Sequence, residues 1–373
     1  MGVGANRPMS GASSQTERQT FDGLDILRGV AALAVLLRHM SDFFRAPWLM
    51  PSGPLAVDLF FVISGFVIAH AYGARLPLLG VLGFMRVRAI RFYPLYLLGL
   101  GLGALYLGAL TASGHQAYSV RDVLTAVAFA VVFLPAPISP LSRFGLAEGH
   151  TIAPIDSPGW SLILEVWVNL FYALVAKRLS SAVLVALICI SGGYLAVGGV
   201  ASGLWQGWTW ESLDFGVART VMSFFVGVLI FEQRARLPRL TWLAGLPGLL
   251  LAACCFMMPK SIAFDLAFVF VVSPLLVAAE VTATTRYRVA PYFAAMSYCI
   301  YVLHEPLVHM LTTIATKFAL PRPVLGIAFI GALLALTPLL DRFYDRPLRK
   351  LLMARKTAPA APETAVKPVL LAA

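Results

Sequence analysis

Two ionisable residues lie eleven positions apart in one hydrophobic stretch near the start of the chain. Arg28 and His39 both fall within residues 24–44, a run long enough to cross a bilayer as one helix. Eleven residues at 100° each return to nearly the same helix face, roughly 16 Å along the axis. Ionisable residues inside a membrane are costly and usually face a protein-lined or wet interior. A histidine there suits general-base work near neutral pH, and an arginine suits binding of an anion.

The composition indicates a polytopic membrane protein. Of the 373 residues, 59% are hydrophobic and only 13% are charged, which is about half the charged share of an average soluble protein. The net charge of +11 suits the flanks of membrane segments better than a nucleic-acid surface. The four cysteines lie in apolar runs and lack metal-ligand spacing, so simple packing roles are favoured.

About eleven apolar segments follow one another, near residues 24–44, 55–72, 92–112, 121–138, 158–176, 180–200, 215–232, 240–258, 262–279, 292–316 and 324–340. Clusters of Lys and Arg mark the ends that face the cytoplasm. Strict alternation of these clusters fails unless one segment before residue 158 does not cross. We expect this segment to be 121–138, because Pro135 and Pro137 shorten its apolar part.

The predicted fold is therefore an all-α polytopic membrane protein. It has about ten transmembrane helices plus one re-entrant or interfacial helix, with both the N- and C-termini cytoplasmic. Residues 1–20 and 355–373 are predicted as disordered cytoplasmic tails, because the first is polar and the second is rich in Ala and Pro. The transmembrane domain would occupy residues 21–354.

Other polar residues recur at helical spacing inside three later apolar segments, among them Asp58, Ser161, Glu165, Tyr301 and His304. The predicted topology places His39, Asp58 and Glu165 in the outer half of the membrane. It places four arginines at the inner boundary: Arg28, Arg86, Arg88 and Arg91.

This arrangement predicts a basic inner vestibule for a phosphate-bearing donor, because guanidinium groups bind phosphates bidentately. His39, deeper in the membrane, would act as general base, and a carboxylate from Glu165 or Asp58 would orient its ring. Arginines at a cytoplasmic helix end often serve only as topological anchors, and that alternative stays open. Trp205 and Trp208 fit an interfacial aromatic belt better than a binding platform.

Five sequence blocks occur in a fixed order along the chain. They are FDGLDILRGVAALAVLLRH with Arg28 and His39, AVDLFFVISGF with Asp58 and Ser64, RAIRFYPLY with Arg88 and Arg91, SPGWSLILE with Trp160, Ser161 and Glu165, and SYCIYVLHEP with Ser297, Tyr298, Tyr301 and His304. From about residue 21 to residue 350, the chain resembles the acyltransferase-3 family of membrane O-acyltransferases. It departs from the family pattern at its end, where FYDRPLRK holds Asp345 instead of a glutamate.

The resemblance implies transfer of an acyl group, most simply acetyl from acetyl-CoA, to a hydroxyl of a carbohydrate or related cell-surface acceptor such as a polysaccharide. His39 would be the catalytic base, with Glu165 the first choice to orient it and Asp58 the second. The other expected site residues would bind or shape the substrates: Arg28, Arg88 and Arg91 for donor phosphates, and Ser64, Trp160, Ser161, Tyr301 and His304 around the reaction. A covalent acyl intermediate on His39 or Tyr301 stays open.

The expected partners are acyl-CoA, a carbohydrate or glycolipid acceptor and the lipid bilayer, with no nucleic acid; a homo-oligomer stays open. Acyl-CoA would be a donor co-substrate, and no bound cofactor or metal is expected. The expected location is a bacterial cytoplasmic (inner) membrane, with multiple passes. A proton-coupled transporter or a flippase of a lipid-linked sugar is the alternative function, because intramembrane His, Glu, Asp and Arg also build carriers.

Overall fold

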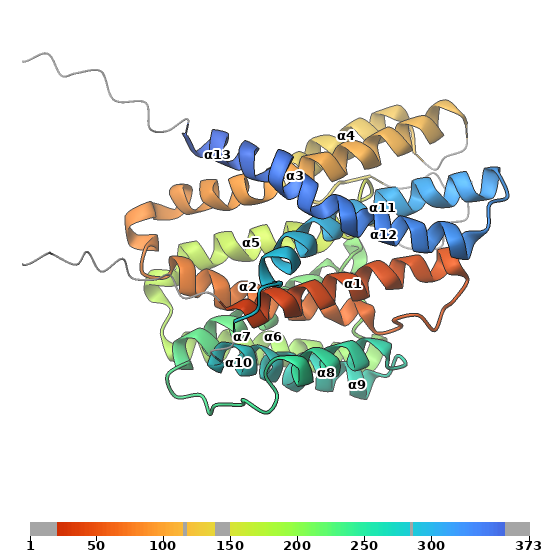
Figure 1. Cartoon of the computed structure of the whole chain (residues 1–373). Helices are drawn as coiled ribbons and strands as arrows, with labels where there is room; N and C mark the ends of the chain where they lie inside the picture. Colours follow the sequence, from red (N-terminus) through yellow and green to blue (C-terminus); the bar gives the residue numbers. More distant parts are fainter. Residues whose placement is uncertain (1–20, 115–117, 139–149, 284–285, 355–373) are drawn as a thin grey trace, which may run out of the picture.

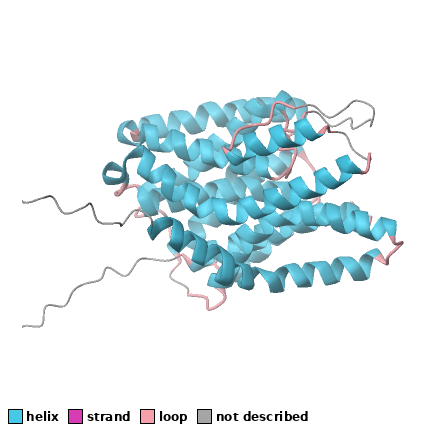
Figure 2. Ribbon diagram, turned by 90° about the horizontal axis from the view of Figure 1, so that it is seen from above, coloured by secondary structure: helices cyan, strands magenta, loops and turns pink. Residues whose placement is uncertain are grey.

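The computed structural model describes residues 21–114, 118–138, 150–283 and 286–354. The tails predicted at 1–20 and 355–373 lie outside these residues. The described part is helical, and its only strand-like pairing is one antiparallel bridge between Thr151 and Thr209. Figures 1 and 2 show the long helices lying side by side in one bundle. The predicted all-α class is confirmed for this part of the chain.

The α-helices in chain order are α1 (Asp22–Phe44), α2 (Ala56–Tyr72), α3 (Leu76–Ala112), α4 (Val120–Val131), α5 (Gly159–Val175), α6 (Ser181–Ser202), α7 (Leu213–Gln233), α8 (Leu246–Met257), α9 (Ile262–Ala267), α10 (Ser273–Thr282), α11 (Ala290–Lys317), α12 (Arg322–Leu340) and α13 (Arg346–Ala354). Short π-helical turns at Phe268–Val272 and Asp341–Asp345 join α9 to α10 and α12 to α13. Each of these pairs therefore continues as one long helix.

Seven helices of the described part are long and apolar enough to cross a membrane: Gly53–Tyr72, Leu76–Ala112, Gly159–Arg178, Ser181–Ser202, Trp210–Gln233, Ile262–Thr282 and Arg322–Ala354. Helix α4 has only 12 residues, so it is about 18 Å long, well short of a hydrocarbon core of about 30 Å. The helix in the segment expected at 121–138 thus ends at Val131, before its prolines.

Helices α1 and α11 fall outside those seven and pack against each other along the bundle. Leu36 and Met40 of α1 belong to one buried cluster with Met296 and Ile300 of α11. Polar residues of α1 and α11 lie in the same interface as these apolar side chains. The two helices therefore contact each other through both polar and apolar residues.

Helix α3 begins sixteen residues earlier than the expected segment at 92–112. The arginines Arg88 and Arg91, expected at a boundary outside the helix, lie within it. Their three-residue spacing puts them on one face, and α3 packs against α5 and α11. Hydropathy missed this part of α3 because it counted the arginines as flanks, whereas the Arg88 side chain is only 11% exposed.

Helices α2 and α7 approach each other very closely. A Cβ atom added at Gly65 of α2 would lie 1.9 Å from the carbonyl oxygen of Phe224, and one at Gly227 of α7 would lie 2.0 Å from that of Val62. No side chain fits at such distances, so both positions require glycine if the backbones are to meet. This contact holds α2, and with it Asp58, against α7.

We predict that Gly65→Ala lowers the free energy of unfolding by about 2 kcal/mol, because the added methyl group must push α2 and α7 apart. Thermal unfolding of the purified protein in detergent measures the change. Gly101→Ala in α3 is the matched control, since a Cβ there meets nothing within 4 Å. Equal stability of the two variants would contradict the close contact between α2 and α7.

Candidate active site

Three cavities lie next to one another inside the bundle, and neighbouring cavities share lining residues. The arginine cavity has a volume of about 110 Å³ and is lined by Arg28, Ser64, Arg88, Arg91, Ser161, Glu165, Tyr298 and Tyr301, among others. The histidine cavity, of about 530 Å³, is lined by His39, Trp160, Trp205, Trp208, Arg219, Tyr301, Glu305 and His309, among others. The end cavity, of about 620 Å³, is lined by Asp22, Asp25, Arg91, Tyr298, Asp345, Arg346, Arg349 and Lys350, among others.

The shared residues give the order of the cavities. Arg91 and Tyr298 line both the end cavity and the arginine cavity. Val57 and Tyr301 line both the arginine cavity and the histidine cavity. The arginine cavity therefore lies between the other two, and the side chains of Val57 and Tyr301 form its wall toward His39.

Each arginine of the arginine cavity has a carboxylate neighbour. Arg28 donates to Asp25 at 2.7 Å, and Arg91 lies 3.8 Å from Asp345. Even so, three buried guanidinium nitrogens, Arg28 Nε, Arg88 Nε and Arg91 Nη1, have no hydrogen-bond partner. Buried N–H groups normally find an acceptor. The cavity thus holds unused donors of the kind that bind phosphate or carboxylate oxygens.

Glu165 lies in the arginine cavity with a different partner from the one expected. Its Oε1 accepts hydrogen bonds from Arg88 at 3.1 Å and from Ser64 at 2.7 Å. The carboxylate is thereby neutralised by an arginine of α3 and held by a hydroxyl of α2. The structure thus brings Ser64, Arg88 and Glu165 together, as one polar group on the arginine side of the wall.

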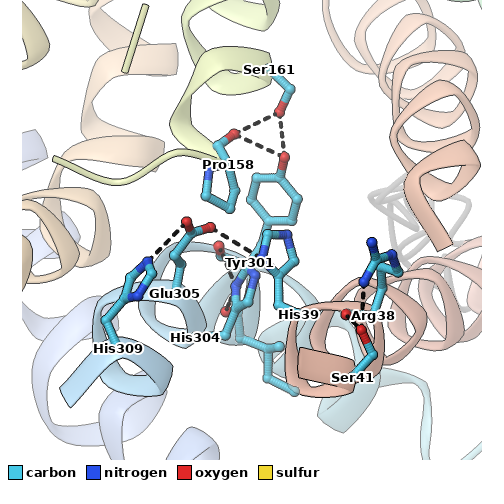
Figure 3. Close-up of polar contacts among 10 residues, drawn as sticks. Arg38, His39, Ser41, Pro158, Ser161, Tyr301, His304, Glu305 and His309 are labelled. Carbon is cyan, nitrogen blue, oxygen red and sulfur yellow. Dashed lines mark hydrogen bonds and ion pairs between the residues drawn. The ribbon is translucent and has the colours of Figure 1, made fainter. Parts of the chain in front are cut away.

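The carboxylate beside His39 belongs to Glu305 of α11. Its Oε2 lies 3.3 Å from His39 Nδ1, and its Oε1 lies 3.3 Å from His309 Nε2 (Figure 3). The Glu305 side chain is 12% exposed and the His39 side chain is 36% exposed. Both line the histidine cavity, and the carboxylate is the more buried of the two. The sequence predicted a carboxylate from Glu165 or Asp58 beside His39; in the structure the neighbouring carboxylate is that of Glu305.

His304 lies directly against His39, with 4.8 Å between ring centroids. Its Nδ1 is 3.0 Å from the carbonyl oxygens of both Ile300 and Tyr301, and the side chain is fully buried. Because a carbonyl only accepts, Nδ1 carries the proton and Nε2 keeps a free lone pair. That Nε2 has no hydrogen-bond partner.

Tyr301 is fixed at the wall by α5 and the loop before it. Its hydroxyl donates to the carbonyl of Pro158 at 3.0 Å and is in close contact with the Ser161 hydroxyl, which also lies 3.2 Å from that carbonyl (Figure 3). Two of the expected site residues, Ser161 and Tyr301, are therefore joined at the boundary between the two cavities.

Asp58 lines neither cavity and is fully buried. Its two oxygens accept from Arg219 of α7 at 3.1 and 2.5 Å, and Arg219 also donates to the carbonyl of Gln206 at 2.8 Å. Arg219 in turn lies over the Trp160 ring at 5.6 Å. Asp58 does not line the histidine cavity itself, but it holds Arg219, which does.

Sequence reasoning gave no role to Glu305, Arg219 or Asp156. Glu305 follows His304 directly in the last motif, and this adjacency was the available signal. Arg219 is a lone cation in an apolar segment, and Asp58 is a lone acid in another. Opposite charges isolated in two apolar segments were the available signal that these two residues pair. Trp205 and Trp208, expected in an interfacial belt, line the histidine cavity together with Trp160.

Asp156 is a buried acid in the loop that precedes α5. It is 5% exposed, and its Oδ1 has no hydrogen-bond partner. Burial raises the pKa of Asp156 well above its usual range, and the nearby negative charge of Glu305 raises it further. Folding therefore makes Asp156 harder to ionise than a carboxyl exposed to water.

A family model and one of two curated relatives name an acyltransferase. The model of a family described as an acyltransferase domain matches residues 21–342. "Protein 2 in picA locus" of Rhizobium radiobacter is 37% identical over 195 residues, which cover 49% of this chain and 97% of that protein. "Acyltransferase MdmB" of Streptomyces mycarofaciens is 29% identical over 184 residues, which cover 44% of this chain and 44% of that protein. No solved structure matches the chain.

We predict that Asp156→Asn changes how stability depends on pH. Because the pKa of Asp156 is raised by folding, its contribution is fully present below the unfolded-state value of about 3.9 and is lost as pH rises through the folded-state value. Asparagine stays neutral, so the variant should unfold at a higher temperature than wild type at high pH, and this advantage should shrink as pH falls. Thermal unfolding across a pH series measures it. Parallel curves for the two proteins would show that folding does not raise the pKa of Asp156.

Proposed function

This chain belongs to the acyltransferase-3 family of membrane acyltransferases, and from that premise we propose its donor, acceptor and catalytic residues. It moves an acyl group, most simply acetyl, from acyl-CoA to a hydroxyl of a carbohydrate or related cell-surface acceptor. The observation that carries this proposal is the His39–Glu305 pair, 3.3 Å apart in a cavity that borders a second cavity lined by arginines.

The donor enters from the side of the arginines. The unused guanidinium N–H groups of Arg28, Arg88 and Arg91 support binding of donor phosphates. The end cavity, which shares Arg91 with the arginine cavity, has room for the nucleotide. The arm that carries the thioester then runs through the narrow arginine cavity toward Tyr301. Arg28 lies roughly 16 Å from His39 along α1, so it holds the donor and does not touch the reacting carbonyl.

His39 acts as general base on the acceptor hydroxyl. The Glu305 carboxylate lies 3.3 Å from Nδ1 of His39 and favours a proton on that nitrogen. This leaves Nε2 free to take the proton of the acceptor, and the negative charge of Glu305 stabilises the imidazolium that forms. The hydroxyl oxygen attacks the thioester carbonyl, and the tetrahedral intermediate collapses by breaking the C–S bond. The thiolate takes the proton from His39 and leaves as a thiol, so no proton is gained or lost overall.

The hydroxyls at the wall stabilise the negative charge on the carbonyl oxygen. Ser161 and Tyr301 lie between the arginine cavity and His39, where the thioester carbon must sit. A hydroxyl donor fixed in place before the reaction stabilises an oxyanion at little reorganisation cost. Both currently donate to the Pro158 carbonyl, so they would turn toward the substrate.

The acceptor occupies the histidine cavity. Trp160, Trp205 and Trp208 give it large aromatic faces, which suit the apolar face of a sugar ring, and Arg219 and His309 add polar groups at its rim. This composition supports a carbohydrate or glycolipid acceptor.

The topology is part of the proposal. Adding α1 and α11 to the seven candidate spans gives nine crossings. Helix α8 has 12 residues, as α4 does, and we count it as the tenth crossing because the basic clusters at residues 234–239 and 286–288 then face the same side of the membrane. The same rule leaves α4 as a re-entrant or interfacial helix. Both termini then face the cytoplasm of a bacterial cell, with the end cavity on that side. Acyl-CoA is made in the cytoplasm, which agrees with a donor that enters by the end cavity.

The direct test uses the purified protein in proteoliposomes, radiolabelled acetyl-CoA and a crude envelope fraction. Transfer of label to envelope glycans supports the enzyme. Movement of a sugar substrate across the bilayer without label transfer would instead favour the transporter or flippase.

We predict that His39→Ala abolishes label transfer, while the protein still inserts and purifies normally.

Glu305→Gln should lower kcat by about 100-fold or more, because the imidazolium loses its counter-charge. Glu165→Gln is the matched comparison and should affect mainly KM for the donor, since Glu165 faces the arginine cavity. A larger loss of kcat in Glu165→Gln than in Glu305→Gln would return the orienting role to Glu165.

We predict that Arg88→Ala raises KM for acyl-CoA by about tenfold or more, because a charge-assisted hydrogen bond is worth about 1.5–3 kcal/mol. Steady-state kinetics at varied donor concentration measure the change. Arg86→Ala is the control: Arg86 is two residues away on α3, donates to the carbonyl of Leu352 and does not line the arginine cavity. Unchanged donor KM in Arg88→Ala would make Arg88 a structural anchor.

A further inference from the structure

Three potential metal-binding side chains meet in the histidine cavity. One ring nitrogen from His39, one from His304 and one carboxylate oxygen from Glu305 all lie within 4.8 Å of one another. His39 belongs to α1, whereas His304 and Glu305 are consecutive in α11. The cluster therefore forms only when the two helices pack, which explains why the spacing of these residues in the sequence did not predict a metal.

His304 is set up as a ligand. Its Nδ1 is engaged by two backbone carbonyls at 3.0 Å, so the neutral ring presents the lone pair of Nε2. Histidines that bind metals usually have the other ring nitrogen held in this way, because that contact fixes the tautomer and the ring orientation. The side chain is fully buried and Nε2 has no hydrogen-bond partner in the protein. A buried acceptor without a partner costs free energy that a bound cation would recover.

Glu305 is held in a similar manner. His309 contacts its Oε1 at 3.3 Å, which leaves Oε2 facing His39. The 3.3 Å between Oε2 and His39 Nδ1 is close enough for an ion pair, yet Oε2 has no hydrogen bond of good geometry. Two ligands of a tetrahedral zinc, each about 2.0–2.1 Å from the ion, lie about 3.4 Å apart. The existing separation already has this value.

We propose that His39, His304 and Glu305 form a binding site for a divalent transition metal of the zinc class, and that its occupancy blocks acyl transfer. Two imidazoles and one carboxylate suit zinc and disfavour Mg²⁺ and Ca²⁺, which prefer oxygen ligands alone. The fourth position opens into the histidine cavity, where water or a substrate hydroxyl completes the coordination. The widest separation in the cluster, 4.8 Å, closes by a rotation of the partly exposed His39 side chain.

The metal inhibits because it binds Nδ1 of His39, the nitrogen that faces Glu305. The proton of the neutral ring then sits on Nε2, which has no lone pair left to accept a proton. His39 cannot accept a proton from the acceptor while a metal ion occupies its ring nitrogen and Glu305 is a ligand of the same ion. Only this inhibitory effect rests on the proposed function; binding of the metal does not. The transferase would then be sensitive to free zinc on the side of the membrane that the histidine cavity faces.

Binding is tested on the purified full chain in detergent, first freed of metal with a chelator. Isothermal titration with Zn²⁺ should show one site per chain, and Mg²⁺ should show none. Co²⁺ used as a probe should give the intense visible absorption of a four-coordinate site. His304→Ala and Glu305→Gln should each weaken Zn²⁺ binding by about 100-fold or more, and His309→Ala by about tenfold, since it only supports a ligand.

His150→Ala is the matched control, because His150 pairs with Glu211 at an exposed position outside the cavity. It should bind Zn²⁺ as wild type does. Glu305→Gln keeps the size of the side chain, so it remains informative if the buried His304→Ala variant does not fold. Absence of a site in wild type, or equal affinity in wild type and Glu305→Gln, would overturn the proposed site.

Inhibition is tested separately. In the label-transfer assay Zn²⁺ should inhibit with a midpoint that matches its measured Kd, and a chelator should restore activity. Full activity with the site saturated would overturn the inhibitory role. A chain that binds zinc but transfers no label under any condition would instead refute the proposed function and leave the metal site standing.

Discussion

Charged side chains inside an apolar helix bundle cost free energy unless each has a partner within reach. For three pairs in the described part of this chain, the two partners come from different helices. Asp58 joins α2 to Arg219 of α7, Arg88 joins α3 to Glu165 of α5, and His39 joins α1 to Glu305 of α11. Each pair satisfies its own charges and also sets how two helices face each other. The polar residues of the site therefore also constrain the helix packing that positions them, as the contact between α1 and α11 shows.

The carboxylates of the site differ because their neighbours differ. Glu165 faces a guanidinium group and a hydroxyl, Glu305 lies between two imidazoles, and burial raises the pKa of Asp156 well above its usual range. Three acids of similar intrinsic strength thus have different surroundings. One lies beside the arginines, one lies beside two histidines, and one is buried with an oxygen that has no hydrogen-bond partner. Environment, more than residue type, distinguishes these acids.

Helical periodicity predicted much of this arrangement and failed at a definite point. It placed Arg28 and His39 on one face of α1, and the sequence motifs marked Ser161, Glu165 and Tyr301, all of which line the cavities. Periodicity tells which residues share a face, but not which helix that face will meet. Glu165 and Glu305 were both acids in apolar segments, and only the packing of α1 against α11 distinguishes them. Hydropathy likewise placed the start of α3 too late. In the sequence alone, an arginine that lines a cavity cannot be distinguished from one that flanks a membrane segment.

The wall formed by Val57 and Tyr301 has a consequence for the membrane itself. Three adjoining cavities without this wall would approach a water-filled pore, and a pore would dissipate the ion gradients that a cell maintains. Under the proposed function only the acyl group has to pass Tyr301, and it is a few atoms long and uncharged. The bulky, multiply charged nucleotide stays among the arginines, and the sugar stays among the tryptophans. Under the proposed function, this wall of two side chains, one of them hydrogen-bonded to the Pro158 carbonyl at 3.0 Å, would keep the two cavities apart for ions while the acyl group is transferred.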